Sequence, residues 1–458
     1  MTPNEKEESK GPKENELTVE QAMALGIKLQ QAGRPNEAAQ IYRAVLNAFP
    51  DYPDAIHFLG LTRFAVKDFG GAVELIQRAL ELAPAYVDAW INLGNVQLHQ
   101  RDYPAAEQTY RKVLDLKPDN VLVWNNLGLA LKGLGRWREA IDALTRAVSG
   151  APDSPEFSQN LGKACCAVGD FTQGASAFRK ALDLRPYEEA AYQNLCRTLY
   201  ILKEEREAER VVRRWLEHDP ENPSARHLLA AYSKQNIPER ASDAYIRETF
   251  DSFAEVFDEV LETLDYRAPQ LVAEALAGQL RDIGHVPAIL DAGCGTGLCG
   301  PLLKPYADHL MGADLSRNML ARAAERKVYD ALEVVELTEF LSSQSDRFDA
   351  IVSADTLVYF GALKDIAQAA FGALRSRGRF VFSLERAPDG ASAGYSIGTH
   401  GRYSHTESYV RDTLAGAGFR IASVDQAVLR MESGDPVDGL VVSAVKPDRP
   451  DREQKAVN

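Results

Sequence analysis

One acidic residue and three glycines, placed just after an apolar run, are the residues best suited to bind a small ligand. Asp291 follows the run 288–290, and glycines then stand at alternate positions: Gly293, Gly295 and Gly297. Glycine lets a chain turn sharply and approach a ligand closely, because a Cβ would block that approach. A second acid, Asp314, ends the next apolar run. An acid placed about 20 residues beyond such a turn is suited to bind two ribose hydroxyls.

Two classes of cofactor bind to loops of this kind. Gly295, Gly297 and Gly300 match the dinucleotide fingerprint GxGxxG, in which the first glycine follows the strand directly so that bare N–H groups meet the pyrophosphate. Here Asp291 occupies the strand end. A carboxylate there would repel a pyrophosphate but would attract the ammonium group of a methionine moiety. The placement therefore favours S-adenosylmethionine over a nicotinamide dinucleotide.

Alternating strands and helices are expected to position these residues. The strands are predicted at residues 288–292, 309–313, 333–336, 350–354, 380–384, 420–429 and 440–445. Helices are predicted near residues 316–326, 363–374 and 406–417, with Ser316 as an N-cap. This alternation is typical of an α/β Rossmann-like domain with a mostly parallel seven-stranded sheet covered on both faces. A short turn at 432–436 predicts that the final strand runs antiparallel, at or near an edge.

The first half of the chain is one unit of 34 residues repeated six times. Four columns keep this step: prolines at 50, 84, 118, 152, 186 and 220; glycines at 26, 60, 94, 128 and 162; small residues from Ala38 to Ala208; and large apolar residues from Tyr42 to Val212. Each unit reads as two amphipathic helices, and the proline ends the second. The small columns predict close helix packing. An apolar face that only the next pair covers predicts an all-α solenoid.

These columns resemble the tetratricopeptide repeat, a family that implies contact with a protein partner. A further column holds four asparagines at the same step: Asn92, Asn126, Asn160 and Asn194. It resembles the asparagine ladder of O-linked N-acetylglucosamine transferase. Since a carboxamide both donates and accepts, such a ladder suits the backbone of an extended peptide. The alternative is that each asparagine bonds to a neighbouring repeat, and the sequence does not choose between the two.

The second half resembles the class I S-adenosylmethionine-dependent methyltransferases, over residues 243–446. The motifs that carry the resemblance are ILDAGCGTG at 289–297, GADLS at 312–316, FDAIVS at 348–353 and GAGF at 416–419. The resemblance implies that Asp291 and the backbone from Gly293 to Gly297 contact the methionine portion. It further implies that Asp314 holds the ribose hydroxyls, that Leu315 packs on the adenine and that Glu336 lies near the adenine amine.

Candidates for the acceptor side follow the fourth and fifth strands, where this fold places its acceptor site. They are Asp355 and Tyr359, then Glu385 and the loop 400–405, which contains Arg402, Tyr403 and His405. We single out Asp355 and His405 as catalytic candidates, His405 as a base near neutral pH. For each, the alternative is a loop or capping role. The aromatic helix at residues 245–257 is either a lid over the cofactor or part of the core.

Composition limits the remaining possibilities. The net charge is −14 and the pI is near 5.2, which argues against a general binder of nucleic acid or membrane surfaces. The five cysteines form no CxxC pair, so we expect reduced thiols, no metal site and a cytoplasmic protein. Residues 1–16 and 447–458 are polar and are predicted to be disordered tails. The expected domains are the repeat array at 17–235, in which residues 223–235 form a closing helix, a linker with N-terminal helices at 236–285, and the cofactor-binding core at 286–446.

The sequence thus predicts an S-adenosylmethionine-dependent methyltransferase whose repeat array recruits a substrate or partner protein. Two alternatives stay open. One is a small-molecule methyltransferase whose array only docks or forms oligomers, and the other is a non-catalytic scaffold with a vestigial cofactor domain. The methyl acceptor is not determined by the sequence.

Overall fold

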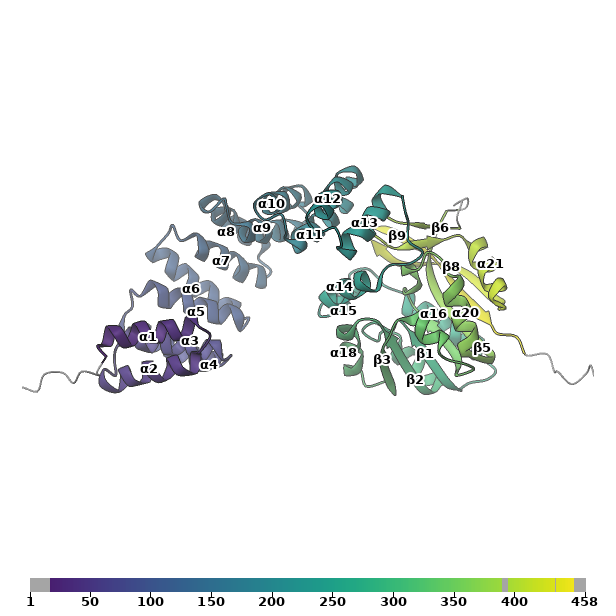
Figure 1. Ribbon diagram of the computed structural model, residues 1–458, viewed down its shortest axis with the longest axis horizontal. Helices are drawn as coiled ribbons and strands as arrows, with labels where there is room; N and C mark the ends of the chain where they lie inside the picture. Colours follow the sequence, from purple (N-terminus) through teal and green to yellow (C-terminus); the bar gives the residue numbers. More distant parts are fainter. Residues whose placement is uncertain (1–16, 389–393, 433, 449–458) are drawn as a thin grey trace, which may run out of the picture. The chain divides into compact units, whose positions relative to one another are not determined.

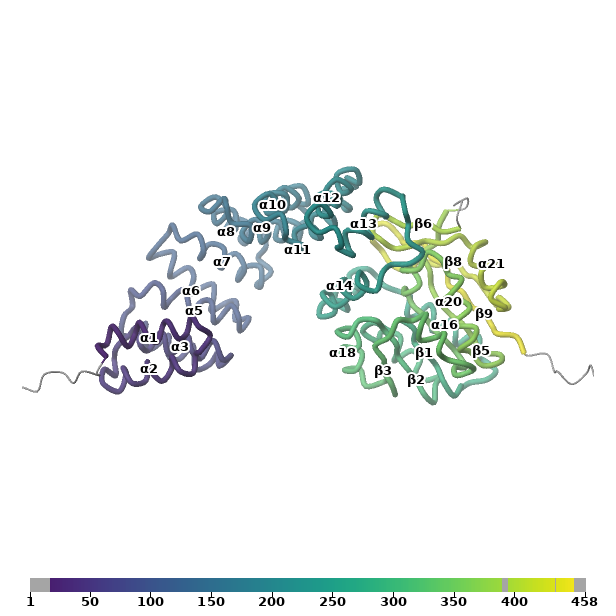
Figure 2. Tube along the Cα trace, viewed as in Figure 1, coloured from purple at the N-terminus to yellow at the C-terminus, as the bar shows by residue number. Residues whose placement is uncertain are grey.

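The computed structural model describes residues 17–388, 394–432 and 434–448. The chain divides into two compact units, Met1–Thr198 and Leu199–Asn458, whose elements are shown in Figures 1 and 2. The predicted tails at 1–16 and 447–458 lie outside the described residues, apart from Pro447 and Asp448. Among the residues described, the helices include none with the length and hydropathy of a membrane span.

The first unit is a stack of helical pairs, as the repeat pattern predicts (Figure 1). Each second helix ends two residues before the repeat proline, as at Ala48 and Pro50, so the predicted role of these prolines is confirmed. Its helices are α1 Val19–Gln31, α2 Pro35–Ala48, α3 Pro53–Ala65, α4 Phe69–Leu82, α5 Val87–His99, α6 Tyr103–Leu116, α7 Val121–Gly133, α8 Trp137–Gly150, α9 Pro155–Ala167 and α10 Phe171–Leu184, followed by α11 Glu189–Ile201, which spans the boundary.

The glycine column and the large apolar column pack against each other within each pair. A Cβ on Gly26 would lie 2.4 Å from the Tyr42 ring, and one on Gly94 would lie 2.5 Å from the Tyr110 ring. Both tyrosines are fully buried. The first helix can therefore approach the second only where it has no side chain, which explains the 34-residue step of the glycines.

The second unit holds the end of the repeat pattern and the α/β domain. Its helices are α12 Glu205–His218, α13 Pro223–Ser233, α14 Asp243–Phe253, α15 Phe257–Glu262, α16 Ala268–Leu280, α17 Gly300–Leu303, α18 Arg317–Glu325, α19 Leu337–Ser342, α20 Lys364–Ala373 and α21 Glu407–Ala417, with 3-10 turns η1 Lys304–Tyr306 and η2 Leu357–Tyr359. The compact-unit boundary thus groups α12 and α13 with the sheet, although the repeat pattern assigns them to the array.

The described part of the second unit contains one sheet of nine strands. They are β1 Val286–Ala292, β2 Ala307–Asp314, β3 Ala331–Val334, β4 Phe348–Ser353, β5 Leu374–Arg386, β6 Tyr395–Ile397, β7 Tyr403–His405, β8 Arg420–Glu432 and β9 Asp435–Val445. Strands β3, β2, β1, β4 and β5 run parallel in that order, and β9 pairs antiparallel with both β5 and β8. The predicted fold class and the predicted antiparallel final strand are confirmed.

Two short strands were not predicted, and several strand boundaries differ from the prediction, that of β3 among them. The short strands β6 and β7 pair with each other, and β7 also pairs with the end of β5. The sequence predicted a loop there, because three-residue strands have no detectable alternation. Strand β3 ends at Val334 rather than at residue 336, because Glu336 is the N-cap of α19.

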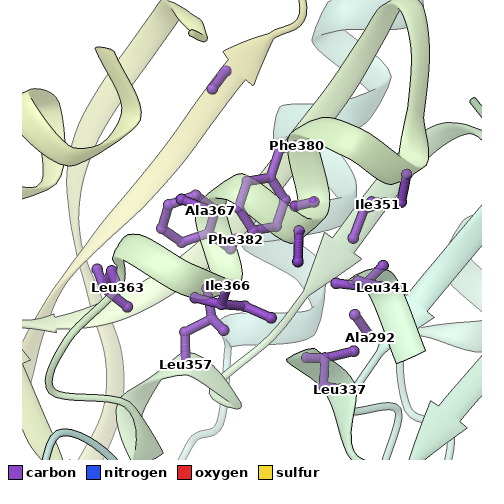
Figure 3. Packing of buried hydrophobic residues seen from close by; sticks show 14 of the residues in the cluster. Ala292, Leu337, Leu341, Ile351, Leu357, Leu363, Ile366, Ala367, Phe380 and Phe382 are labelled. Atoms are coloured by element: carbon purple, nitrogen blue, oxygen red, sulfur yellow. The ribbon is translucent and has the colours of Figure 1, made fainter. Parts of the chain in front are cut away.

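Alternate residues of the central strands face two separate cores, as expected for a sheet covered on both faces. Phe380 and Phe382 of β5 pack with Leu357, Leu363 and Ile366 on one face (Figure 3). Val381, between them in the sequence, belongs to the core on the other face, which includes residues of α16. Both layers hold the central strands in place, so the loops at their carboxyl ends start from fixed points.

Candidate active site

The glycine turn after β1 adopts the conformation that its sequence predicts. Gly293, Gly295 and Gly297 have φ values of 74°, 54° and 84°, a region that other residues adopt only at a cost. A Cβ on Gly293 would lie 2.1 Å from Thr356 Oγ1. At Gly295, by contrast, a Cβ would meet nothing within 4 Å. The turn therefore presents bare backbone to open space at Gly295, as a ligand-binding loop requires.

Asp291 is buried at the end of β1 with one carboxylate oxygen unsatisfied. Its side chain is 1% exposed, and Tyr329 donates a hydrogen bond to Oδ2 at 2.6 Å. Oδ1 has no hydrogen-bond partner among the described residues. Burial raises the pKa of Asp291 to about 7, against the effect of the Tyr329 hydrogen bond. An unpaired buried carboxylate is costly, so a cationic ligand at Oδ1 would relieve that cost.

Asp314 ends β2 beside the glycine turn, because β1 and β2 pair in parallel. Its Oδ2 accepts a hydrogen bond from the Gly295 N–H at 2.9 Å, and its Oδ1 accepts one from the Ser316 N–H at 2.8 Å. Burial raises the pKa of Asp314, and these two backbone N–H groups oppose that rise. Each carboxylate oxygen retains a second lone pair, so Asp314 can order the turn and still accept from a ligand hydroxyl.

The two other predicted cofactor residues have different surroundings. Leu315 is partly buried next to Asp314. Glu336 accepts hydrogen bonds from the N–H groups of Thr338 and Glu339, at 3.1 Å and 2.7 Å, as the N-cap of α19. Its Oε1 also lies 3.6 Å from Arg240. Glu336 thus has a capping role, and its proximity to an adenine amine stays a prediction.

Helices α14 and α15 bond to the loops that follow β1 and β2. Asp251 accepts hydrogen bonds from the Ser316 hydroxyl and, at 3.3 Å, from the Asn318 N–H. Asp258 accepts from the Thr296 hydroxyl and from Arg326. No residue of α15 is buried, and Tyr245 is the buried residue of α14. These contacts favour the lid interpretation over core packing.

A buried network of charged side chains lies at the carboxyl ends of β4 and β5. Arg430, on β8, donates to Asp355 Oδ2 at 2.6 Å and also bonds to Glu385 and Glu432. Arg402 bonds to Glu385 at 2.6 Å and to Glu432 at 2.5 Å. All five side chains are one-fifth exposed or less. Three carboxylates facing two guanidinium groups leave the network with a net charge of −1 when all five are ionised.

The network sets the protonation of its carboxylates. Burial raises the pKa of Glu385, but Arg402, His400 and Arg430 outweigh this effect and hold it at about 2. Burial also raises the pKa of Asp355, with Arg430 opposing. Asp355 itself has a φ of 51°, and its N–H donates to Ser383 Oγ at 2.9 Å. The residue after Asp355, Thr356, donates from Oγ1 to the Gly293 carbonyl at 3.0 Å. Asp355 is therefore the member of the network that adjoins the glycine turn.

Family models match both halves of the chain. The methyltransferase-domain family matches residues 290–382, and two tetratricopeptide-repeat families match residues 59–121, 125–193 and 166–232. The chain thus carries tetratricopeptide repeats followed by a methyltransferase domain.

Two curated relatives are similar in sequence to part of this chain. Human methyltransferase-like protein 27 is 35% identical over 123 residues, which is 26% of this chain and 49% of the relative. The Arabidopsis thaliana 18S rRNA (guanine-N(7))-methyltransferase RID2 is 34% identical over 95 residues, which is 21% of this chain and 31% of the relative. The chain therefore spans half or less of the length of these two relatives.

Solved structures similar to this chain include MamA from Desulfovibrio magneticus RS-1, with a TM-score of 0.35 and 22% identity, over 37% of this chain and 97% of that one. Pseudomonas aeruginosa pilF has a TM-score of 0.40 and 16% identity, over 46% of this chain and 96% of that one.

Within the methyltransferase domain, His405 does not lie where a base would. It is fully buried on β7, and its Nε2 is 3.0 Å from the Gly361 carbonyl. Its ring stacks on Tyr409, with centroids 5.9 Å apart. Burial lowers the pKa of His405 to about 4. A group so enclosed cannot reach a substrate proton, so the structure assigns His405 to packing, contrary to the prediction.

The asparagine column of the repeats bonds mainly between repeats. Asn126 donates to Asn95 at 3.0 Å, and Asn160 donates to Asn125 at 2.9 Å. Asn92 Nδ2 lies 3.0 Å from His57 Nε2. Asn194 differs, because it donates to a carbonyl of its own helix, Ala190, at 2.6 Å. Three of the four carboxamides thus contact the preceding repeat, which favours the inter-repeat alternative over a peptide ladder.

Several site residues were missed by the sequence analysis. Tyr329 lies in the loop between α18 and β3, 38 residues from the carboxylate it contacts. Arg430 and Glu432 lie on β8, beyond the predicted end of that strand. The sequence signal for them was the charged residues Arg430 and Glu432 just after the apolar residues 428 and 429. Charged residues are unusual in a strand that packs on a core.

Proposed function

We propose that this protein is an S-adenosylmethionine-dependent methyltransferase whose repeat array recruits a substrate or partner protein. The observation that carries the proposal is Asp291, a buried carboxylate with a free oxygen beside a glycine turn that exposes its backbone at Gly295. Asp291 would hold the methionine ammonium, and Asp314 would hold the ribose hydroxyls. Leu315 and Glu336 would contact the adenine.

When bound, S-adenosylmethionine supplies an electrophilic methyl group on a sulfonium. The residues of the chain then have three tasks: to align the acceptor, to exclude water and, where the nucleophile starts protonated, to take up its proton. Helices α14 and α15 suit the second task, because Asp251 accepts from Ser316 and Asp258 accepts from Thr296, in the loops that carry the proposed cofactor residues. The rings of Phe250, on α14, and Tyr359 also pack edge to face, with centroids 5.5 Å apart.

Asp355 is the candidate for the acceptor side. It follows β4, and Arg430 favours its ionised form. An ionised carboxylate that already accepts from Arg430 and Ser383 can still orient an acceptor N–H or O–H through a remaining lone pair. In this role Asp355 positions the nucleophile, and it takes the proton if one must leave.

Calorimetry with S-adenosylmethionine and S-adenosylhomocysteine tests the cofactor assignment. We expect binding by the wild type and loss of binding in Asp314→Ala and Gly295→Arg. Gly135→Arg is the matched control, because Gly135 also has a positive φ and open space around it but lies in the repeats. Unchanged affinity in both site variants would refute the assignment.

Label transfer tests the reaction. The purified full chain is incubated with radiolabelled-methyl S-adenosylmethionine and extract from its own cells, with Asp314→Ala alongside. Label in protein supports recruitment of a protein substrate, and label in small molecules supports an array that only docks or forms oligomers. Label in RNA would indicate an RNA substrate, the class named for the Arabidopsis relative. No label in any fraction, with cofactor binding intact, would favour the scaffold alternative.

A further inference from the structure

The charged network depends on a short segment that lies between β6 and β7. Arg402, at the end of this segment, bonds to both Glu385 and Glu432 and so joins β5 to β8. His400 of the same segment lies 3.5 Å from Glu385. The backbone of residues 398–402 therefore sets where the guanidinium of Arg402 meets its two carboxylates.

This segment is held by the last helix of the repeat pattern. His227, on α13, places Nε2 2.7 Å from the carbonyl oxygen of Gly401. The partner is an acceptor, so Nε2 carries the proton and donates. His227 is 4% exposed, and its ring stacks on Tyr245 at 4.2 Å. Gly401 has a φ of 84°, and a Cβ there would lie 2.9 Å from the Tyr245 hydroxyl.

Three further contacts tie the same region to the end of the repeat pattern and the segment after it. Lys234 donates to the Ile397 carbonyl at 2.6 Å, and the Tyr403 hydroxyl donates to the Pro238 carbonyl at 2.8 Å. The ring of Tyr200 contacts His400 edge to face, with centroids 6.0 Å apart. None of these groups belongs to a methyltransferase motif, yet together they enclose residues 397–403.

We propose that His227 is a positioning residue for the acceptor side of the methyltransferase site. It fixes Gly401, which places Arg402. Arg402 and Arg430 share Glu385, and Arg430 in turn bonds to Asp355 and orients its carboxylate. The closing helix of the repeat array is then a working part of the catalytic unit. The inference rests on the proposed function, because it takes Asp355 to face the methyl acceptor.

The test compares full-chain variants that differ in one hydrogen bond. His227→Leu removes the donor, and His227→Gln restores a side-chain N–H at a similar reach. Arg226→Leu is the matched control: it lies next to His227 on α13, is exposed, and bonds to the Pro220 carbonyl and Glu221 rather than to the segment. Lys234→Met removes a second, half-buried support and repeats the test if His227→Leu fails to fold.

Two measurements are made on each variant. One is amide hydrogen exchange in residues 395–405, and the other is the initial rate of label transfer from saturating S-adenosylmethionine into extract from the protein's own cells. For His227→Leu we expect exchange in the segment to rise and transfer to fall by about tenfold each, the size of a lost buried hydrogen bond. Cofactor affinity should stay within about twofold, because the cofactor residues lie on β1 and β2. Rescue by His227→Gln with no effect in Arg226→Leu would support the inference.

Wild-type exchange in His227→Leu would overturn the inference, and so would faster exchange with unchanged transfer. A wild type that binds no S-adenosylmethionine would refute the proposed function instead. The exchange comparison would still confirm or refute that His227 fixes the segment.

Discussion

The Tyr329 hydroxyl donates to Oδ2 of Asp291 at 2.6 Å, while Oδ1 of the same carboxylate has no partner among the described residues. Half of the carboxylate is therefore satisfied by the protein and half is left for a ligand. The ring of Tyr329 also packs near the backbone of the turn, since a Cβ on Gly297 would lie 2.9 Å from it. One side chain thus orients the acid and supports the loop that would share the ligand.

Tyr329→Phe should weaken cofactor binding. The variant keeps the ring that supports the turn but removes the hydrogen bond that favours the ionised form of Asp291. We expect the Kd for S-adenosylmethionine to rise about tenfold, which corresponds to about 1.4 kcal/mol. Calorimetry at pH 7.5 measures the change. Tyr306→Phe, in the same unit but away from Asp291, is the control, and equal affinities in the two variants would contradict the assigned role of Tyr329.

The cofactor affinity should rise with pH between about 6 and 8. Burial raises the pKa of Asp291 to about 7, so the carboxylate is protonated below this value and ionised above it. Only the ionised form attracts an ammonium group, so each pH unit below 7 should cost up to about tenfold in affinity. Calorimetry across the pH range measures the slope. Asp291→Asn should bind weakly at every pH, and a slope that survives in it would assign the titration to another group.

The same pKa makes a prediction about the ligand-free protein. Because the folded state raises the pKa of Asp291, the protonated acid stabilises the fold at low pH, and this contribution is lost as the pH rises through about 7. From its ordinary value near 3.9, the change corresponds to about 4 kcal/mol of unfolding free energy. Asp291→Asn should therefore be more stable than the wild type at pH 8 and similar at pH 4, as measured by urea denaturation. Equal stability at pH 8 would contradict the raised pKa.

Arg430→Met should destabilise the second unit strongly. The variant removes the guanidinium that pairs with Asp355, Glu385 and Glu432, so these buried carboxylates lose a cationic partner. We expect a loss of about 3–5 kcal/mol at neutral pH. Part should return near pH 5, because the freed carboxylates gain a raised pKa and take up protons on folding. Denaturation at the two pH values measures this, with Arg420→Met at the exposed start of β8 as control. A loss that does not depend on pH would point to packing alone.

Asn126→Ala and Asn160→Ala should lower the stability of the repeat array. Each removes a half-buried donor to the preceding repeat and should cost about 1–2 kcal/mol, whereas Asn194→Ala, whose bond stays within its own helix, should cost less. Denaturation monitored by helical circular dichroism gives the comparison. Unchanged stability together with lost binding of a peptide partner would restore the peptide-ladder hypothesis.

The sequence alone determined the features that depend on local spacing. The 34-residue step identified the repeats. The glycine of each first helix packs against a large side chain of the second helix, so the two positions recur together at a fixed spacing. Asp291, the alternating glycines and Asp314 predicted the conformation of the glycine turn, because a strand end, a positive φ and a following strand are adjacent in the chain. The expected N-cap at Ser316 was confirmed for the same reason, since its hydroxyl accepts from the Met319 N–H three residues away.

Only the tertiary structure decided which distant groups meet. The contact of Tyr329 with Asp291, the bonds of Arg430 to Asp355 and Glu385, and the bond from His227 to Gly401 join residues 38 to 174 positions apart. Burial could not be predicted from the sequence either. His405, just before a predicted helix, was a candidate base, and the structure shows that it is fully buried. Hydrogen bonds and pKa values are set by what surrounds a side chain, and spacing along the chain does not carry that information.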